Sequence, residues 1–319
     1  MKTHHLRRQG LLGTTLFVGL LLGALAGCSS TSSSSDGKPT VVVTTPILGD
    51  LVRQVGGDQV DVEVLIPLGA DPHEFEPSAS QAARLRDASL IVANGLGLEE
   101  RLESFIDSAR NDGVTVFAVG EELDPLPISN GPEEADQAHG AEDPHFWLDP
   151  ERMATAASLI ATQLATATGQ DPVGFRTRAS AYAGTARAAE AEARSLLATL
   201  PADQRKLVTN HDALRYFANR FDLEVIGTVI PGISTMAEPS AADLSGLVEV
   251  IKANNVKAIF SESTASSKMI ESLAREVGSQ VSVVELSTDT LGPHGSDTAT
   301  YPELIVTTAR LIANGLSGR

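Results

Sequence analysis

The chain has 319 residues, and its 24 lysines and arginines are outnumbered by 41 aspartates and glutamates, which gives a formal net charge of −17. Such acidity leaves no basic stripe to meet phosphates, which argues against nucleic acid as a partner. It fits a soluble domain outside the cell and would mildly concentrate cations near the surface.

The first 27 residues have the pattern of a secretory signal. Lys2 and Arg7-Arg8 precede an apolar run, Leu11 to Leu25, which is too short to span a bilayer as a stable helix. The run ends in Leu25-Ala26-Gly27-Cys28. This ending resembles a bacterial lipobox, in which the cysteine becomes the first mature residue and carries the lipid. We therefore predict a lipoprotein signal peptide over residues 1–27. We also predict that a lipid on Cys28 anchors the protein to the cell membrane, on its extracytoplasmic side.

Cys28 is also the only cysteine in the chain. Neither a disulfide framework nor a cysteine-bound zinc site is therefore available within one chain. The alternative interpretation of Cys28 is a free thiol in an ordinary signal region. A lipid-modified cysteine can carry more than one acyl chain, and two chains are about what stable anchoring requires. Cleavage before Cys28 would leave 21 basic against 41 acidic residues and a net charge of −20.

A short connecting segment follows the cysteine. Ser29 to Pro39 is rich in serine and has no apolar residue. We expect residues 28–39 to form a flexible tether with a mean span of roughly 18 Å. The remaining length, about 280 residues, is enough for a sizeable core and is better divided into two domains than held in one.

From Thr40 onward, short β-branched runs alternate with longer helical patterns, which is typical of βα units around a parallel sheet. We predict an α/β fold of two similar lobes, each with a mostly parallel four-stranded sheet. The first four predicted strands are Thr40 to Thr45, Val60 to Ile66, Ser89 to Asn94 and Val114 to Val119. The second four are Lys206 to Asn210, Glu224 to Ile230, Val256 to Glu262 and Val281 to Leu286.

One long helix is predicted between the two sets of strands. Asp171 to Leu200 is rich in alanine, glutamate and arginine, with Pro172 near its start and Pro201 after its end. A single helix here would run roughly 45 Å, along both lobes. The alternative is two helices with a break near Gly184. The predicted domains are therefore an N-terminal lobe, 40–169, a linking helix, 170–201, and a C-terminal lobe, 202–319.

The segment Glu121 to Asp143 departs from this rhythm. It contains three prolines and the acidic run Glu133-Glu134-Ala135-Asp136, so it cannot be a helix or a strand throughout. We expect a long surface loop, in which the acidic run is a solvated face.

The histidines are the most informative residues, since only five remain after His4 and His5 leave with the signal. His73 follows the second predicted strand, His211 directly follows the fifth, and Asp289 lies just past the eighth. Open parallel sheets bind ligands at the carboxyl ends of their strands, so these side chains could converge in a cleft between the lobes. His145 would add a further imidazole. Each histidine alone is more often structural, but three imidazoles and a carboxylate would complete the four-coordinate site that zinc prefers.

Five ordered motifs carry a family resemblance over nearly the whole mature chain. They are Gly69-Ala70-Asp71-Pro72-His73-Glu74-Phe75-Glu76-Pro77-Ser78, Asn94-Gly95-Leu96-Gly97-Leu98-Glu99, Asp143-Pro144-His145-Phe146-Trp147-Leu148-Asp149-Pro150, Thr209-Asn210-His211-Asp212-Ala213-Leu214-Arg215-Tyr216-Phe217 and Ser287-Thr288-Asp289-Thr290-Leu291-Gly292. With them the sequence resembles the zinc- and manganese-binding lipoproteins of ATP-binding cassette importers. The resemblance implies metal ligation by His73, His145, His211 and Asp289, two α/β lobes joined by a long backbone helix, and a monomer that serves a membrane permease.

The same resemblance bears on the choice of metal. Manganese members of the family tend to have a glutamate where this chain has His211, so zinc is expected here and manganese is the alternative. Many zinc members carry a histidine-rich stretch before the Asp-Pro-His motif, whereas this chain has acids and the single His139. His294, between Pro293 and Gly295, is interpreted as a loop residue.

Two further functions compete with a metal receptor. A surface metalloenzyme would hold zinc by three histidines and keep an open position for an activated water, whereas Asp289 would fill that position. No second histidine lies four residues after His73, and the pair Gly95-Leu96-Gly97 lacks the third glycine of a dinucleotide fingerprint. We therefore predict that the chain is not an enzyme. An adhesin is the third hypothesis, and it predicts a partner whose binding is indifferent to chelation.

Overall fold

The computed structural model describes residues 37–128, 142–278 and 280–318. The predicted signal peptide, Cys28, most of the tether, and His139 lie outside the described residues. From Lys38 to the end the chain forms one compact unit. No helix in the described part of the chain is both long and apolar enough to cross a membrane.

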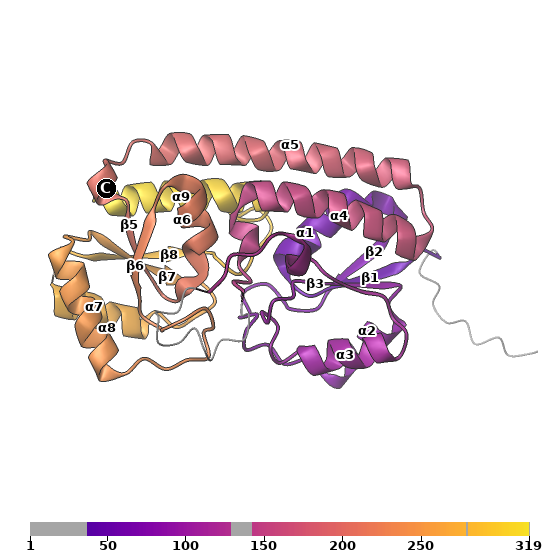
Figure 1. Cartoon of the computed structure of the whole chain (residues 1–319), viewed down its shortest axis with the longest axis horizontal. Coiled ribbons are helices and arrows are strands. Elements are labelled where there is room, and N and C mark those ends of the chain that lie inside the picture. Colours follow the sequence, from indigo (N-terminus) through magenta and orange to yellow (C-terminus); the bar gives the residue numbers. More distant parts are fainter. Residues whose placement is uncertain (1–36, 129–141, 279, 319) are drawn as a thin grey trace, which may run out of the picture. The chain divides into compact units, whose positions relative to one another are not determined.

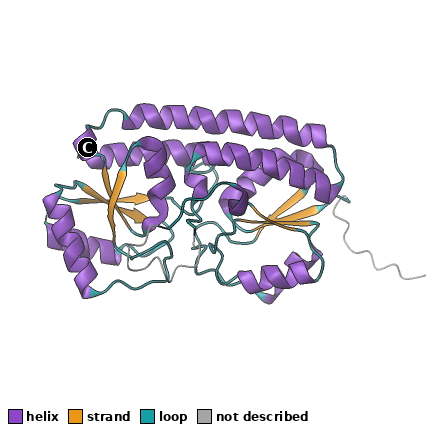
Figure 2. Ribbon diagram, in the orientation of Figure 1, coloured by secondary structure: helices purple, strands orange, loops and turns teal. Residues whose placement is uncertain are grey.

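The N-terminal lobe is built on a four-stranded parallel sheet (Figure 1). Its strands are β1 (Thr40–Val43), β2 (Asp61–Val64), β3 (Leu90–Ala93) and β4 (Val116–Ala118), in the order β2-β1-β3-β4. Its helices are α1 (Pro46–Gly56), α2 (Ala79–Asp87), α3 (Glu103–Asn111) and α4 (Pro150–Thr168). Helices lie on both faces of the sheet (Figure 2).

The C-terminal lobe repeats this plan. Its strands are β5 (Lys206–Thr209), β6 (Glu224–Thr228), β7 (Ala258–Glu262) and β8 (Ser282–Leu286), parallel and in the order β6-β5-β7-β8. Its helices are α6 (Arg215–Phe221), α7 (Ala241–Ala253), α8 (Lys268–Val277) and α9 (Tyr301–Ser317). In both sheets the second strand along the chain lies on one side of the first and the third lies on the other. A ligand-binding crevice is expected at such a reversal of strand order.

All eight predicted strands are confirmed, each within its predicted range. The central strands carry continuous apolar runs because helices cover both faces of each sheet. Val41 and Val43 of β1 face one hydrophobic cluster, whereas Val42 between them faces another. The alternation recurs in β7, where Phe260 and Ile259 belong to different clusters. The cluster that contains Val41 and Phe260 draws residues from both sheets, so one apolar core is shared between the lobes.

The lobes are joined by α5 (Pro172–Leu197), which lies along α4 and α9 (Figure 1). Asp171 caps its start, where the side-chain oxygens accept hydrogen bonds from the backbone nitrogens of Val173 at 2.9 Å and Gly174 at 3.0 Å. The helix is continuous through Gly184, so the broken-helix alternative is wrong. Its 26 residues correspond to about 39 Å.

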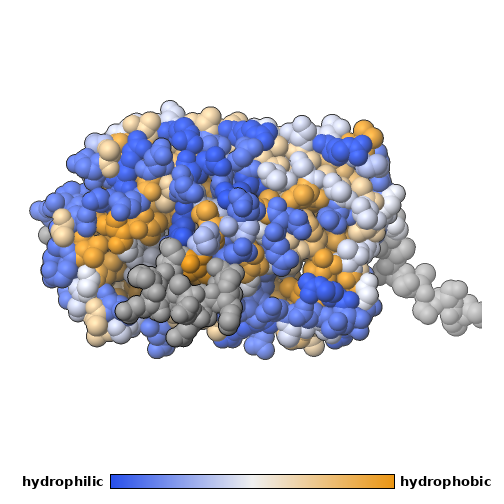
Figure 3. Space-filling view, in the orientation of Figure 1, coloured by the Kyte–Doolittle hydropathy of each residue, from blue (hydrophilic) through white to orange (hydrophobic). Residues whose placement is uncertain are grey.

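The buried side of α5 is formed mostly by alanines, which allow close approach to the two neighbouring helices. Charged and polar residues cover much of its outer side (Figure 3). The helix ends three residues before the predicted Leu200. The domain boundaries at 40–169, 170–201 and 202–319 stay predictions.

The loop predicted at Glu121–Asp143 is described only at its two ends. A 3-10 turn covers Gly120–Glu122, and Pro127 forms an isolated antiparallel bridge with Glu142. The acidic run lies outside the described residues.

Candidate metal centre

The four side chains singled out by sequence lie together, and they come from both lobes. His73 lies in the turn that follows β2, and His145 begins the 3-10 turn Phe146–Leu148 before α4. From the other lobe, His211 follows β5 and Asp289 follows β8. All four are buried, with exposed fractions of 0 or 1%.

The three imidazole rings form a compact triangle. Their centroids are separated by 5.4 Å for His73 and His145, 5.4 Å for His73 and His211, and 5.1 Å for His145 and His211. One nitrogen from each ring can be chosen so that the three lie within 4.8 Å of one another. The Nε2 atom of His211 also lies 4.0 Å from Oδ2 of Asp289. His211 therefore belongs both to the triangle of imidazoles and to a second group with the carboxylates of Glu262 and Asp289.

Two hydrogen bonds from backbone nitrogens to aspartate side chains position the two histidines of the N-terminal lobe. The Asp71 side chain accepts a hydrogen bond from the backbone nitrogen of His73 at 2.9 Å. In the same way, Oδ1 of Asp143 accepts from the backbone nitrogen of His145 at 3.0 Å. Each aspartate precedes a proline in an Asp-Pro-His sequence, so the same side-chain-to-backbone hydrogen bond occurs twice.

Two carboxylates fix the orientation of two of the rings. Oδ1 of Asp143 lies 2.8 Å from Nδ1 of His145, and Oε2 of Glu262 lies 2.7 Å from Nδ1 of His211. An ionised carboxylate only accepts hydrogen bonds, so both Nδ1 atoms carry a hydrogen. In the neutral rings both Nε2 atoms therefore present lone pairs, as in metal-binding histidines whose other nitrogen donates to a carboxylate.

These two Nε2 atoms face each other at 3.2 Å. Two lone pairs cannot be held this close in a dry site unless a cation lies between or beside them. A proton satisfies that requirement, and so does a metal ion. With Zn–N bonds of 2.0–2.1 Å, tetrahedral zinc separates two ligand nitrogens by about 3.3 Å.

The other two residues of the centre lack hydrogen-bond partners. Among the described residues, neither ring nitrogen of His73 and neither carboxylate oxygen of Asp289 has one. Buried polar atoms are nearly always paired, and burial of a charge without a partner is costly. A bound cation would give one ring nitrogen of His73 and the carboxylate of Asp289 the partner that they lack.

The titration behaviour of the centre reflects burial and mutual repulsion of the rings. Burial, followed by the electrostatic effect of His145 and His211, lowers the pKa of His73 to about 2. Burial also lowers the pKa of His145 well below its ordinary value. Both rings are therefore neutral at physiological pH.

His211 behaves in the opposite way. Burial would lower its pKa, but the nearby Glu262 carboxylate and its hydrogen bond, together with Asp289, raise the pKa to about 9. Burial raises the pKa of Asp289 itself to about 8. Without a metal ion, His211 is therefore the imidazole that holds a proton.

Sequence reasoning missed Asp143 and Glu262 as the residues that orient the rings. Asp143 lay within a quoted motif, and its position two residues before His145 is the signal that could have identified it. Glu262 ends β7, at the same edge of the sheet from which His211 emerges. A buried acid at the carboxyl end of a parallel strand was the available signal. Glu262 also accepts a hydrogen bond from the Asn210 side chain at 3.1 Å.

His294, the one other histidine in the part of the chain that the structure describes, does not belong to this centre. His294 is exposed and lines a different, open cavity of about 1340 Å³ between α1, α5 and α9. Within the described ranges, the residues that could share a metal ion form two overlapping groups, His73 with His145 and His211, and His211 with Glu262 and Asp289.

Comparison with known proteins agrees with this fold. Residues 41–315 match the family described as ZnuA, zinc-uptake complex component A, periplasmic. The zinc-binding protein TroA of Treponema pallidum is 31% identical over 302 residues, which cover 93% of this chain and 95% of that protein. The manganese ABC transporter substrate-binding lipoprotein PsaA of Streptococcus pneumoniae is 28% identical over 307 residues, with coverage of 95% and 97%.

A solved structure gives the same relationship. The periplasmic zinc-binding protein TroA of Treponema pallidum aligns with a TM-score of 0.79 at 31% identity, covering 88% of this chain and 99% of that chain. Because the family match spans most of the sequence, the chain belongs to the ZnuA family of periplasmic metal-binding receptors of ATP-binding cassette importers, which are solute-binding proteins and not enzymes.

Proposed function

We propose that this receptor captures zinc outside the cytoplasm and delivers it to the permease of its importer. Its ligands are His73, His145, His211 and Asp289. The observation that carries the proposal is the 3.2 Å separation of the His145 and His211 Nε2 atoms, each turned inward by a carboxylate at Nδ1. That separation is close to the roughly 3.3 Å expected between two nitrogens on one tetrahedral zinc ion.

The donor set favours zinc over manganese. Three imidazoles and one carboxylate suit zinc, whereas manganese prefers sites richer in oxygen. The names of the relatives leave both metals open, since TroA is named for zinc and PsaA for manganese. With Asp289 as the fourth ligand, no position remains for an activated water, as befits a receptor that releases its cargo unchanged.

Metal content and affinity test the proposal. The mature protein purified from metal-replete medium should contain zinc, measured by elemental analysis. Competition with a chromophoric chelator should show weaker zinc binding in His211→Ala, because water then replaces one imidazole. His294→Ala is the matched control, since this exposed histidine lies outside the centre. Manganese in preference to zinc, or unchanged zinc affinity in His211→Ala, would contradict the proposal.

A second substitution tests the choice of metal. His211→Glu replaces a nitrogen ligand by oxygen and should weaken zinc far more than manganese. Zinc binds more tightly than manganese at nearly any such site. The ratio of the two affinities in variant and wild type is therefore the quantity to compare, rather than either affinity alone.

We also propose that the receptor is a monomer anchored through a lipid on Cys28. The support is the lipobox-like sequence and the serine-rich stretch that follows it. Cys28→Ala should release the protein from the membrane and leave its zinc affinity unchanged, because the tether separates anchor from site. A Cys28→Ala protein that stays membrane-bound after a salt wash would contradict the anchor.

A further inference from the structure

Trp147 links the segments that carry two of the proposed ligands. It is the only tryptophan in the chain and is 2% exposed. Its indole nitrogen donates a hydrogen bond to the backbone carbonyl of Thr288 at 2.7 Å. Trp147 lies two residues after His145, and Thr288 directly precedes Asp289. A single buried hydrogen bond therefore joins the His145 segment of one lobe to the Asp289 segment of the other.

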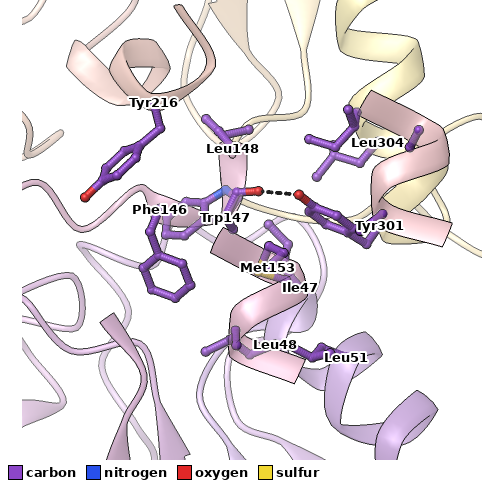
Figure 4. Packing of buried hydrophobic residues seen from close by; sticks show 14 of the residues in the cluster. Ile47, Leu48, Leu51, Phe146, Trp147, Leu148, Met153, Tyr216, Tyr301 and Leu304 are labelled. Atoms are coloured by element: carbon purple, nitrogen blue, oxygen red, sulfur yellow. Dashed lines mark hydrogen bonds between the residues drawn. The ribbon is translucent and has the colours of Figure 1, made fainter. Parts of the chain in front are cut away.

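The backbone of Trp147 is held from a third segment. The Tyr301 hydroxyl donates a hydrogen bond to the Trp147 carbonyl at 2.8 Å (Figure 4). Tyr301 is the first residue of α9, is fully buried, and stacks on Tyr182 of α5 with a centroid separation of 6.0 Å. The bond therefore attaches the Trp147 turn to α9, whose first residue packs against the linking helix α5.

The indole also contacts the proposed ligand itself. The rings of Trp147 and His145 pack edge to face with centroids 5.2 Å apart. Asp143 holds the other side of the imidazole through Nδ1. His145 is thus confined between a carboxylate and an aromatic ring, and this ring is fixed to the loop that carries Asp289.

We infer that Trp147 is a positioning residue that sets the separation of His145 and Asp289 and thereby favours an ion of tetrahedral preference. This inference rests on the proposed function. An ion that demands more ligands needs a wider space, and the Trp147–Thr288 bond opposes widening. The groups around a first coordination sphere typically contribute 10- to 100-fold to metal affinity.

Two aromatic-to-phenylalanine variants and one matched control test this role, and only the tyrosine variants are nearly isosteric. Trp147→Phe removes the indole donor and leaves the Thr288 carbonyl without it. Tyr301→Phe removes only the hydroxyl that holds the Trp147 carbonyl. Tyr182→Phe is the control, because the buried Tyr182 hydroxyl has no hydrogen-bond partner among the described residues and its ring lies beside Tyr301.

Chelator competition measures the zinc and cobalt affinities of each variant. The visible spectrum of the Co²⁺-loaded protein reports the coordination geometry. Unfolding of the metal-free protein reports its stability. Trp147→Phe should bind zinc about 10- to 100-fold more weakly. Its cobalt spectrum should lose the intensity of a tetrahedral site. Tyr301→Phe should shift both readouts in the same direction by less, and Tyr182→Phe should match wild type.

The outcomes separate this inference from the proposed function. Wild-type zinc affinity and cobalt spectrum in Trp147→Phe, with or without a change in stability, would overturn the inference and leave the zinc receptor intact. If Trp147→Phe fails to fold, Tyr301→Phe is compared with Tyr182→Phe instead. Identical cobalt spectra in those two variants would overturn the inference about Trp147. A wild-type protein that does not bind zinc would overturn both.

Discussion

The Nε2 atoms of His145 and His211 lie 3.2 Å apart, although the two rings belong to different lobes. Each ring is held by a carboxylate on its far side, from Asp143 and Glu262. This arrangement fixes which nitrogen of each ring is available to a ligand. Its consequences for affinity, for proton exchange and for spectroscopy can be measured.

Removal of the carboxylate behind His211 should weaken zinc binding. In Glu262→Ala the ring loses its 2.7 Å hydrogen bond and is free to rotate or to exchange tautomers. We expect a loss of about 10- to 100-fold in zinc affinity, measured by chelator competition. Glu285→Ala, an exposed glutamate on β8, should leave the affinity unchanged. Equal affinity in both variants would show that the ring needs no support from Glu262.

Zinc binding should release a proton even at pH values where an ordinary imidazole is already neutral. The pKa of His211 is raised to about 9, so the metal-free protein holds a proton on this ring through physiological pH. Zinc requires the neutral ring, so lower pH favours the metal-free state. The apparent affinity should therefore rise as pH increases from about 6 to about 9.

The proton count distinguishes His211 from its neighbours. The pKa of His73 is lowered to about 2 and that of His145 is also lowered, so these rings have no proton to release near pH 7. Asp289, whose pKa burial raises to about 8, adds to the release. Calorimetric titration in two buffers of different ionisation enthalpy should give at least one proton released per zinc. Identical enthalpies in the two buffers would contradict the protonated His211.

Trp147 should report occupancy of the centre by fluorescence. It is the only tryptophan, and its ring lies 5.2 Å from that of His145. A divalent charge beside His145 changes the field at the indole, so emission should change in intensity or wavelength and saturate at one equivalent of zinc. His211→Ala should shift this titration to higher zinc concentration. Unchanged tryptophan emission on addition of zinc, while chelator competition shows binding, would contradict a zinc site beside His145.

Asp149 should be a major source of stability in the metal-free protein. Its buried carboxylate accepts two hydrogen bonds from Arg220 of α6, one from Arg152, and one from the backbone nitrogen at the start of α4. Asp149→Ala should lower the free energy of unfolding of the metal-free protein by about 2 to 4 kcal/mol. Asp297→Ala, which removes an exposed partner of Arg310, should cost less than about 1 kcal/mol. Denaturant unfolding measures both, and equal costs would contradict this role.

The fold could be predicted from the sequence because its elements are specified locally. Most strands of the two sheets are short runs rich in apolar or β-branched residues, although β2 alternates acidic residues with valine, and α5 begins at an Asp-Pro cap. The strand ends were less certain, because they depend on which residues pair. Val60 and Val114, for example, were included in predicted strands but lie outside the ladders of β2 and β4.

The groups that support the centre could not be predicted in the same way. Glu262 lies 51 residues from His211 in sequence, and Thr288 lies 141 residues from Trp147. The local sequence around each residue does not identify its partner. The Glu262–His211 pair forms only when β5 and β7 pair in one sheet, and the Trp147–Thr288 pair forms only when the two lobes pack together. Asp143 is part of the same sequence motif as His145, but a motif does not reveal which nitrogen of the histidine the aspartate contacts.

The burial of the four proposed ligands has a consequence for transport. Each is at most 1% exposed, so an ion held by them would be largely shielded from solvent. Spontaneous loss then requires a local opening of the protein, and the residence time of the ion is set by the frequency of that opening. A receptor with this site would therefore retain its ion between encounters with the importer, and the rate of release would depend on whatever event opens the site.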